Sequence, residues 1–369
     1  MHEITTETAA DYLRQTGKAS AADRIVVREL AGGVSNAVFY VRVQTADDAP
    51  ENSFVLKQAR PQLRVAQPWF CNVERNWREL AVLRICQSIL ESQPPHVETA
   101  DDLRATTPAV LWEDRENFAF AMTAAPMNHG VWKQWLLTGG GANFAAHARN
   151  GHIATACGRL LARLHSGSWR DKAIRAELGD TAIFDALRID PYYRTIAAVH
   201  ADLRLHVERL IDSLAEHPLA LVHADFSPKN LLVYPSGDRT ELMMVDFETG
   251  HFGDPAFDLG FFLTHLVLKA CYFAPLSTPL IGLANDFWAA YFVTLGLHTA
   301  DDQRDLARRA MQHLGACIVA RLDGKSPVDY LDEPQRRDAA RTFGRNLLLD
   351  PVDAWPAATT RLRLSVAWL

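Results

Sequence analysis

The chain of 369 residues lacks several features that mark secreted, zinc-binding or membrane proteins. Its five cysteines are odd in number, widely scattered and form no Cys-x-x-Cys pair, which argues against a disulfide framework and against a zinc site. Scattered thiols of this kind are typical of a reducing compartment. The N-terminal residues are polar and contain no apolar signal core, so we expect a cytoplasmic protein.

Long hydrophobic runs and a strong charge imbalance are also missing. The most apolar stretch, 256–276, contains Asp258, His265 and Lys269, which a membrane helix tolerates poorly. We therefore predict a buried helix of a soluble protein. The net charge of −6 is mild for this length and argues against a general nucleic-acid binder. We expect no nucleic-acid and no membrane partner, and the sequence does not specify an oligomeric state.

The pattern of apolar residues changes along the chain. β-rich runs predict strands at 25–30, 37–43, 53–59, 109–115, 117–126, 230–235 and 241–247. Helical spacing predicts helices at 5–17, 72–90, 144–168 and 192–216, with further helices from Asp258 onward. This order predicts an α+β fold with two lobes. A small N-terminal lobe, 1–121, combines an antiparallel sheet with one helix; a hinge spans 122–127; and a larger, mostly helical lobe spans 128–369.

The segment 221–233 concentrates polar side chains between two apolar, strand-like runs. Asp225 and Asn230 are five residues apart, and Asp246 ends the next predicted strand. The pattern His-x-Asp-x-x-x-x-Asn followed by Asp-Phe matches the template for phosphoryl transfer from ATP. There, one carboxylate orients the attacking hydroxyl and accepts its proton, while the Asn and a second carboxylate hold Mg²⁺. The alternative is a hairpin whose polar side chains only satisfy the backbone, and Asp246 favours the catalytic interpretation.

A glycine turn lies upstream, between the first two predicted strands. It contains Gly32, Gly33, Ser35 and Asn36. Glycine allows backbone N–H groups to approach phosphates closely, and the Ser and Asn side chains add donors. Two glycines in a hairpin more often form a simple tight turn. The turn is not a Walker loop, because no Gly-Lys-Ser/Thr follows it.

Lys57 is centred in the third predicted strand, one strand after the glycine turn. A strand lysine is usually solvated, but this position suits a lysine that binds phosphates. Glu79 in the following helix could hold the ammonium group by an ion pair. Glu74 is the alternative partner, and Glu79 is favoured because it precedes an apolar run. The order of glycine turn, Lys, Glu, Asp-Asn and Asp is stronger than any one of these signals.

These motifs resemble the aminoglycoside phosphotransferase and choline kinase superfamily, which includes methylthioribose, homoserine and fructosamine kinases. The likeness covers about 30–268, and the segment 223–230 is similar to the family's His-Gly-Asp-x-x-x-x-Asn loop, with Ala224 where Gly is common. The resemblance implies a protein-kinase-like fold. It also implies transfer of the γ-phosphate of ATP to a hydroxyl of a sugar, an amino alcohol or an aminoglycoside-like compound.

The resemblance also implies roles for individual residues around the catalytic loop. Asp225 is expected to be the catalytic base, with Asn230 and Asp246 as Mg²⁺ ligands. Where protein kinases have Asp-Phe-Gly, this chain has Asp-Phe-Glu, so Glu248 could join Asp246 at the metal, directly or through water. The alternative is a solvated Glu at a strand end. Asp258 is expected to brace the catalytic loop by hydrogen bonds to its backbone.

The same resemblance implies which residues bind the nucleotide. Lys57 is expected to contact the α- and β-phosphates while Glu79 holds it, and the loop 32–36 covers the triphosphate. The hinge is expected to bind the adenine edge through Met122, Thr123 and Ala125.

Several alternatives stay open. The chain could be a nucleotide-binding regulatory module without catalysis, although the retained acidic and basic residues argue against this. A protein kinase is a further alternative, but no long activation segment or Ala-Pro-Glu motif is evident. The acceptor is not specified; Asp-Phe-Glu slightly favours methylthioribose-like or choline-like compounds. Arg321, Asp323 and Lys325 either line the acceptor side or stabilise helix ends, and Lys229 either contacts the γ-phosphate or faces solvent.

Overall fold

The computed structural model describes most of the chain: residues 3–30, 36–45, 52–60, 73–92, 103–139, 144–237, 239–274, 276–296, 299–367 and 369. The chain forms two compact units. The first comprises 1–87 and 107–127, and the second comprises 88–106 and 128–369. Residues 88–106 thus count with the second unit, while the division at a hinge over 122–127 stays a prediction.

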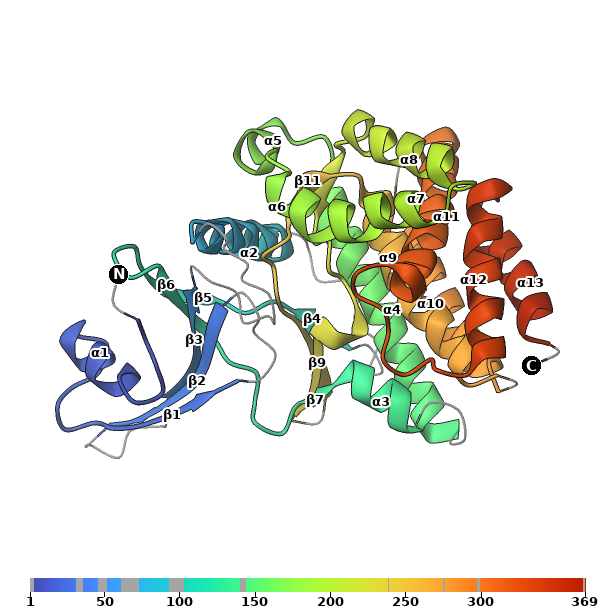
Figure 1. Cartoon of the computed structure of the whole chain (residues 1–369). Helices are drawn as coiled ribbons and strands as arrows, with labels where there is room; N and C mark the ends of the chain where they lie inside the picture. The colour runs from blue at the N-terminus through green and yellow to red at the C-terminus, as the bar shows by residue number, and fades with distance from the viewer. Residues whose placement is uncertain are drawn as a thin grey trace. The chain divides into compact units, whose positions relative to one another are not determined.

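The first unit is built on one antiparallel sheet with the strand order β1-β2-β3-β6-β5. Figure 1 shows this sheet in blue to teal. Its strands are β1 (Arg24–Glu29), β2 (Asn36–Gln44), β3 (Asn52–Ala59), β5 (Val110–Asp114) and β6 (Ala119–Thr123). The helices are α1 (Ala9–Gln15) and α2 (Arg75–Ser92), whose last residues count with the second unit.

Alternation of side chains along β2 and β3 separates the core from the candidate site. Phe39, Val41, Phe54 and Leu56 point to one face and form a buried cluster that also contains Tyr12 of α1. Each such side chain contributes about 1.5–3 kcal/mol on burial. The next residue of β3 points to the opposite face, and this residue is Lys57.

The second unit is mostly helical (Figure 1). Its helices are α3 (Trp132–Gly139), α4 (Phe144–Gly167), α5 (Lys172–Leu178), α6 (Ala182–Phe184), the π-helical segment η1 (Asp185–Arg194), α7 (Thr195–Val199), α8 (Arg204–Glu216), the 3₁₀ turn η2 (Pro228–Asn230), α9 (Pro255–Tyr272), α10 (Thr278–Leu295), α11 (Ala300–Asp323), α12 (Pro334–Leu349) and α13 (Trp355–Val366). Two small sheets complete it: β4 (Arg104–Thr106), β10 (Arg239–Met244), β9 (Leu231–Ser236) and β7 (Gly130–Val131) in that order, and β8 (Ala220–Val222) with β11 (His251–Gly253).

Helix α9 lies at the centre of the second unit, and nearly every one of its side chains is buried. It packs closely on α11, where a Cβ at Gly260 would lie 2.6 Å from the backbone nitrogen of Leu314. Glycine therefore permits this close helix contact. The expected buried helix is confirmed from residue 256 to Tyr272, where α9 ends, whereas Leu276 at the end of the predicted stretch is exposed. In the described part of the chain, every helix is too short or too polar to cross a membrane.

The predicted α+β class is confirmed, with an antiparallel sheet near the N-terminus and a helical C-terminal part. The single predicted helix over 192–216 is wrong, because the chain leaves the helical conformation at His200. The ring of His200 contacts Asp323 at 3.0 Å and Arg345 at 3.2 Å, which fixes this break. β8 coincides with the strand-like run before the polar segment, whereas β4, β7 and β11 were not predicted, since two or three residues are too short to show a period.

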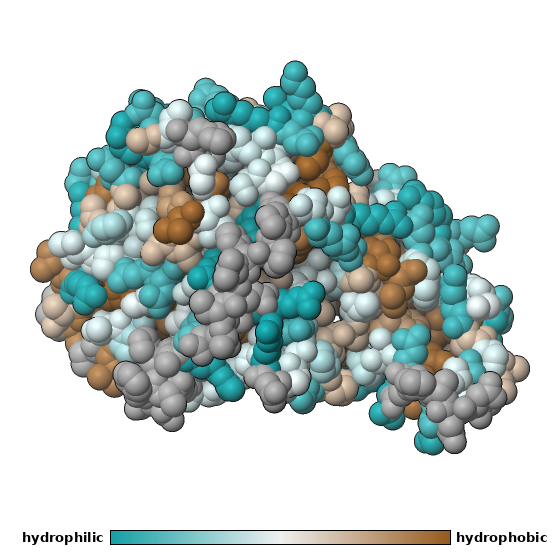
Figure 2. Space-filling view, turned by 180° about the vertical axis from the view of Figure 1, so that it is seen from behind, coloured by the Kyte–Doolittle hydropathy of each residue, from teal (hydrophilic) through white to brown (hydrophobic). Residues whose placement is uncertain are grey.

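The face shown in Figure 2 is mostly hydrophilic where its residues are described, with hydrophobic residues in small separate patches. Single exposed apolar side chains, such as Val293 at 83% exposure, are normal for globular proteins.

Candidate functional site

The candidate catalytic loop, 223–230, called the catalytic loop below, leaves β8 and ends in η2. Its backbone is held by the carboxylate of Asp258, which accepts the N–H groups of His223 and Ala224, both at 2.7 Å. Asp258 is fully buried in α9 and also contacts the Nε2 atom of His165 at 3.3 Å. Burial raises the pKa of Asp258, but His165 and His223, including the His223 N–H, outweigh this and hold the pKa below its usual value. The brace expected from the sequence is present.

His223 anchors the same loop. Its Nδ1 atom accepts the backbone N–H of Asp225 at 3.2 Å, and Nε2 donates to the carbonyl of Val245 at 3.3 Å. Burial lowers the pKa of His223 below its usual value, so the ring is neutral at physiological pH. The hydroxyl of Thr249 donates to the His223 carbonyl at 3.0 Å. Both ring nitrogens of His223 are thus used in hydrogen bonds that hold the loop in place.

The carboxylate of Asp225 lies at the centre of a cluster of cations and is 4% exposed. Its Oδ1 atom is 2.8 Å from Arg188, and its Oδ2 atom is 2.7 Å from Lys229 and 2.9 Å from the amide nitrogen of Asn230. Burial raises the pKa of Asp225, but Arg188 and Lys229 outweigh it and hold the pKa well below its usual range. Asp225 is therefore an anion throughout the physiological range. Lys229 is half-exposed and paired with Asp225, which neither sequence alternative anticipated.

Arg188 was missed by the sequence analysis. It comes from η1, where the unusual helical path carries it to the catalytic loop. Its Nε atom donates to the carbonyl of Ala224 at 2.7 Å, while its guanidinium pairs with Asp225. It thus fixes two consecutive residues of the loop. An arginine in the sequence Asp-Ala-Leu-Arg-Ile-Asp, more than thirty residues upstream, carries no signal of this contact.

The candidate metal ligands lie beside this carboxylate. The backbone N–H of Val245 donates to the carbonyl of Asn230 at 3.0 Å, which holds the start of the Asp-Phe-Glu segment against the loop. Asp246 has a left-handed backbone with φ of 73°. The charges of Asp246 and Glu248 both act on Arg188, so all of these groups share one region.

The donor chemistry of this region fits Mg²⁺. Asn230 uses its amide nitrogen toward Asp225, which leaves the oxygen as its metal-binding atom, and Asp246 supplies a carboxylate. Mg²⁺ prefers hard oxygen ligands and usually takes one or two protein groups together with phosphate oxygens and water. No group of three or more His, Cys, Asp or Glu side chains arranged for a metal occurs in the described ranges. Two protein ligands agree with this finding, and a direct bond from Glu248 stays a prediction.

The first unit contains a buried ion pair on the face of the sheet opposite its main core. Lys57 of β3 and Glu79 of α2 approach to 2.6 Å, and their side chains are 7% and 2% exposed. Glu79 is the partner that the sequence favoured. Asn36 is buried at the start of β2. Gly32, Gly33 and Ser35 lie outside the described residues, so their role in covering phosphates stays a prediction.

The expected adenine-binding residues lie at the end of β6. Met122 and Thr123 belong to the strand, and Ala125 follows it. The backbone N–H of Thr123 donates to the carbonyl of Ala109 at 2.8 Å, and its hydroxyl accepts the Ala109 N–H at 2.8 Å. The N–H of Thr123 is therefore used within the sheet. Adenine binding through Met122, Thr123 and Ala125 stays a prediction.

The open alternative for Arg321, Asp323 and Lys325 is partly resolved. Asp323 accepts two bonds from Arg341, at 2.8 and 2.9 Å, and so joins α11 to α12. Lys325 pairs with Asp190 at 2.7 Å on the surface. These two residues connect structural elements, whereas Arg321 lies among the aromatic and basic side chains discussed below.

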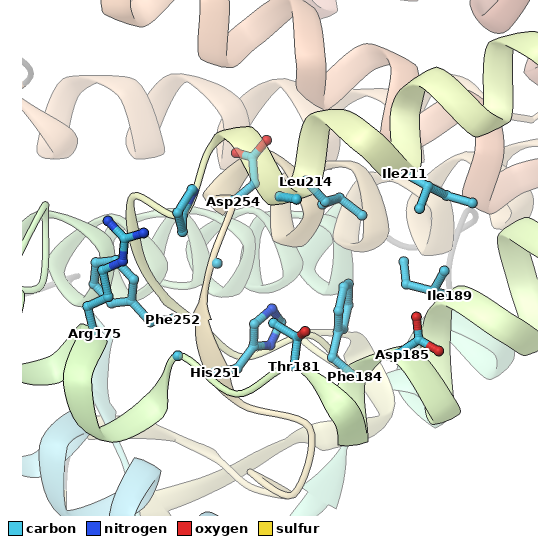
Figure 3. A pocket seen from close by; sticks show the side chains of 14 residues that line it. Arg175, Thr181, Phe184, Asp185, Ile189, Ile211, Leu214, His251, Phe252 and Asp254 are labelled. Carbon is cyan, nitrogen blue, oxygen red and sulfur yellow. The ribbon is translucent and has the colours of Figure 1, made fainter.

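A separate cavity of about 360 Å³ lies elsewhere in the second unit (Figure 3). Figure 3 shows Phe184, Leu214 and His251 lining it, with Arg175 and Asp254 at its sides. The lining comes mainly from α5, α6, η1, α8 and β11, and includes no residue of the catalytic loop. The candidate catalytic site is therefore distinct from this cavity.

Comparisons with known proteins agree with this geometry. The model of the phosphotransferase enzyme family (APH) matches residues 26–296. The chain belongs to this family. The methylthioribose kinase of Yersinia pseudotuberculosis serotype O:3 is 25% identical, over 99% of this chain and 97% of that protein. The methylthioribose kinase of Pectobacterium carotovorum is 23% identical, over 94% of each.

Solved structures of other kinases share the fold of this phosphotransferase. A microcompartment-associated aminopropanol kinase matches with a TM-score of 0.54 at 16% identity, over 95% of this chain and 99% of that one. The amicoumacin kinase hAmiN matches with a TM-score of 0.50 at 15% identity, over 95% and 97%. The family and its relatives together make the chain an ATP-dependent kinase of a small molecule, as the sequence predicted.

Proposed function

We propose that this phosphotransferase uses Asp225 to direct a hydroxyl group of its acceptor at the γ-phosphate of ATP. The observation that carries the proposal is the geometry of Asp225. Its carboxylate is buried, ionised and fixed by Arg188, Lys229 and Asn230 at the end of a braced loop. Phosphoryl transfer proceeds through a loose transition state, so it asks for positioning more than for a strong base. A carboxylate with a low pKa and a fixed orientation suits this task.

The remaining groups bind the nucleotide and balance its charge. Lys57, oriented by Glu79, binds the α- and β-phosphates, and Lys229 is close enough to Asp225 to act at the γ-phosphate. Asn230 and Asp246 hold Mg²⁺, with Glu248 in its surroundings. The ion, when bound, neutralises charge on the phosphate oxygens. The backbone near Ala125 binds the adenine edge.

The acceptor is a small molecule with a hydroxyl group, and the sequence leaves a sugar, an amino alcohol or an aminoglycoside-like compound open. The curated relatives are methylthioribose kinases, so a methylthioribose-like sugar is the first compound to test. Cytoplasmic location follows from the scattered cysteines as a further proposal.

Replacement of Asp225 by Asn tests this proposal. A coupled assay that follows ADP release should show kcat reduced by about 10²–10⁴-fold, the usual contribution of a positioned base. Binding of Mg²⁺-ATP, measured by calorimetry, should persist, since Asp225 is assigned to the acceptor hydroxyl. Asp212→Asn, an exposed change on α8, serves as the control. Near-full turnover of the Asp225→Asn enzyme would show that the assignment is wrong.

A further inference from the structure

Lys269 is the most unusual cation of the second unit. It lies near the end of α9 and is 0% exposed. Its ammonium donates to the carbonyl of His265 at 3.1 Å and lies 5.1 Å from the ring centre of Tyr330. No carboxylate pairs with it within the part of the chain that the structure describes. A buried ammonium with one hydrogen bond is costly, since desolvation opposes its charge.

Other polar atoms around Lys269 are also buried without a hydrogen-bond partner among the described residues. They are the hydroxyl of Tyr330, the Nε2 atom of His265 and the Nε atom of Arg321. Lys269 contacts both His265 and Tyr330, as described above, and the charge of Arg321 acts on all three residues, so Arg321 belongs to the same region. Buried polar atoms are normally paired, so these unpaired atoms mark a place where a polar ligand could form several hydrogen bonds at once.

Positive charge predominates in this cluster of Lys133, Lys269 and Arg321. Burial and the charges of Lys133 and Arg321 lower the pKa of Lys269 to about 7, and Asp329 opposes them. Lys133 is 3.8 Å from Asp329, and their side chains are 36% and 81% exposed. The cluster therefore meets solvent near Lys133 and Asp329.

The cluster connects to the catalytic loop along one face of α9. Phe261, His265 and Lys269 are spaced four residues apart, so they share this face, and the helix rises about 12 Å from Phe261 to Lys269. The guanidinium of Arg188, which binds Asp225, lies 5.6 Å from the ring of Phe261. The Phe261 ring lies 5.1 Å from the His265 ring. This span suits a small molecule with a hydroxyl at one end and a charged group at the other.

We propose that the phosphoryl acceptor carries an anionic group, a carboxylate or a phosphate, that binds Lys269 while its hydroxyl reaches Asp225. The inference rests on the proposed function and narrows its acceptor to an anionic compound, so it replaces a neutral methylthioribose-like sugar as the expected substrate. Tyr330 donates its hydroxyl to the anion, His265 donates from Nε2, and Arg321 adds charge. A polycationic aminoglycoside or a charged amino alcohol would meet repulsion here. A sugar acid, a small hydroxy acid or a phosphorylated polyol fits the charge.

The variant Lys269→Met separates ligand binding from a structural role. Removal of a buried ammonium that lacks a carboxylate partner should leave the thermal midpoint at pH 6 unchanged or higher. The KM for the anionic acceptor should rise by about 10- to 100-fold, the worth of one charge-assisted hydrogen bond. The KM for ATP should stay unchanged, and Lys269→Arg should restore part of the loss. Lys172→Met, at an exposed position of α5, controls for loss of one positive charge. A lower midpoint with an unchanged acceptor KM would overturn the proposal.

A coupled kinase screen on the full-length enzyme identifies the anion. Its arms contain hydroxy acids such as glycerate and gluconate, phosphorylated polyols such as glycerol 3-phosphate, neutral sugars, and amino alcohols with aminoglycosides. Turnover confined to the hydroxy acids or to the phosphorylated polyols supports the proposal and shows whether the anionic group is a carboxylate or a phosphate. Preference for neutral or cationic acceptors overturns it, yet leaves the kinase assignment intact.

If the enzyme phosphorylates none of the compounds in the screen, a measurement of anion binding tests the proposal instead. With Mg²⁺ and a non-hydrolysable ATP analogue present, sulfate should raise the thermal midpoint of the wild type more than that of Lys269→Met. Equal shifts would overturn the proposal. Failure of the proposed function itself would appear differently, as turnover that survives Asp225→Asn.

Discussion

Replacement of Asp258 by Asn should weaken both the fold and the catalytic loop. The carboxylate accepts the N–H groups of His223 and Ala224, both at 2.7 Å, and no part of it is exposed. Asn has one acceptor oxygen, so its NH₂ group would face one of these two donors. Loss of a hydrogen bond to a charged group, with a buried N–H left unsatisfied, costs about 3 kcal/mol. Urea denaturation followed by tryptophan fluorescence should show a loss of this size in the free energy of unfolding.

The same variant should lower kcat/KM by about 100-fold, because a displacement of the loop near 1 Å misplaces Asp225. The control is Asp350→Asn, which removes an exposed pair with Arg361 and should cost about 0–1 kcal/mol. The pKa of Asp258 is lowered in the folded state, so its stabilisation is full at neutral pH and is lost as the pH falls. The difference in the free energy of unfolding between the wild type and Asp258→Asn should therefore become smaller below about pH 4. A loss under about 1 kcal/mol at pH 7 would refute the bracing role.

Three further predictions concern other parts of the site. Glu79→Met should destabilise the fold by about 3–5 kcal/mol because it removes the carboxylate that lies 2.6 Å from the buried ammonium of Lys57. The double variant Lys57→Met/Glu79→Met should regain most of this stability in thermal unfolding without regaining activity. Ala224 is fully buried and has a left-handed backbone with φ of 58°. Ala224→Gly should change stability by less than about 1 kcal/mol, since relief of this backbone strain offsets lost burial, whereas Ala224→Val should cost more than about 2 kcal/mol; equal effects in denaturation would contradict this account. Chelation by EDTA should abolish turnover and added Mg²⁺ should restore it; activity that persists in EDTA would disprove the metal assignment.

The sequence predicted the parts of the site that depend on local order. The spacing of Asp225 and Asn230, followed by Asp246 after a strand, predicts a loop and an adjacent turn because short strands fix the distance between them. Lys57 and Glu79 were predicted from consecutive elements of one small sheet and its helix. The apolar alternation that buries Leu56 also places Lys57 on the opposite face.

The parts that the sequence did not predict depend on tertiary contacts. Arg188 reaches Asp225 through a π-helical segment that has no distinct periodicity in the sequence. The contact between Arg188 and Asp225 could therefore not be predicted from the sequence. Lys269 was noted only as a charge inside an apolar helix, which excluded a membrane span. Its neighbours Lys133, Arg321 and Tyr330 come from three other places in the sequence. Only the packing of α9 with those segments shows that their charges and unpaired atoms converge.

The anchoring of the catalytic loop through main-chain atoms has a consequence for divergence within the family. Asp258 and Arg188 both hold backbone groups of the loop, and a backbone group is present whatever side chain a position carries. Substitutions at loop positions that do not contact substrate can therefore accumulate without displacing Asp225. The acceptor side can change from one charge class to another over evolutionary time while the geometry of phosphate transfer is inherited unchanged.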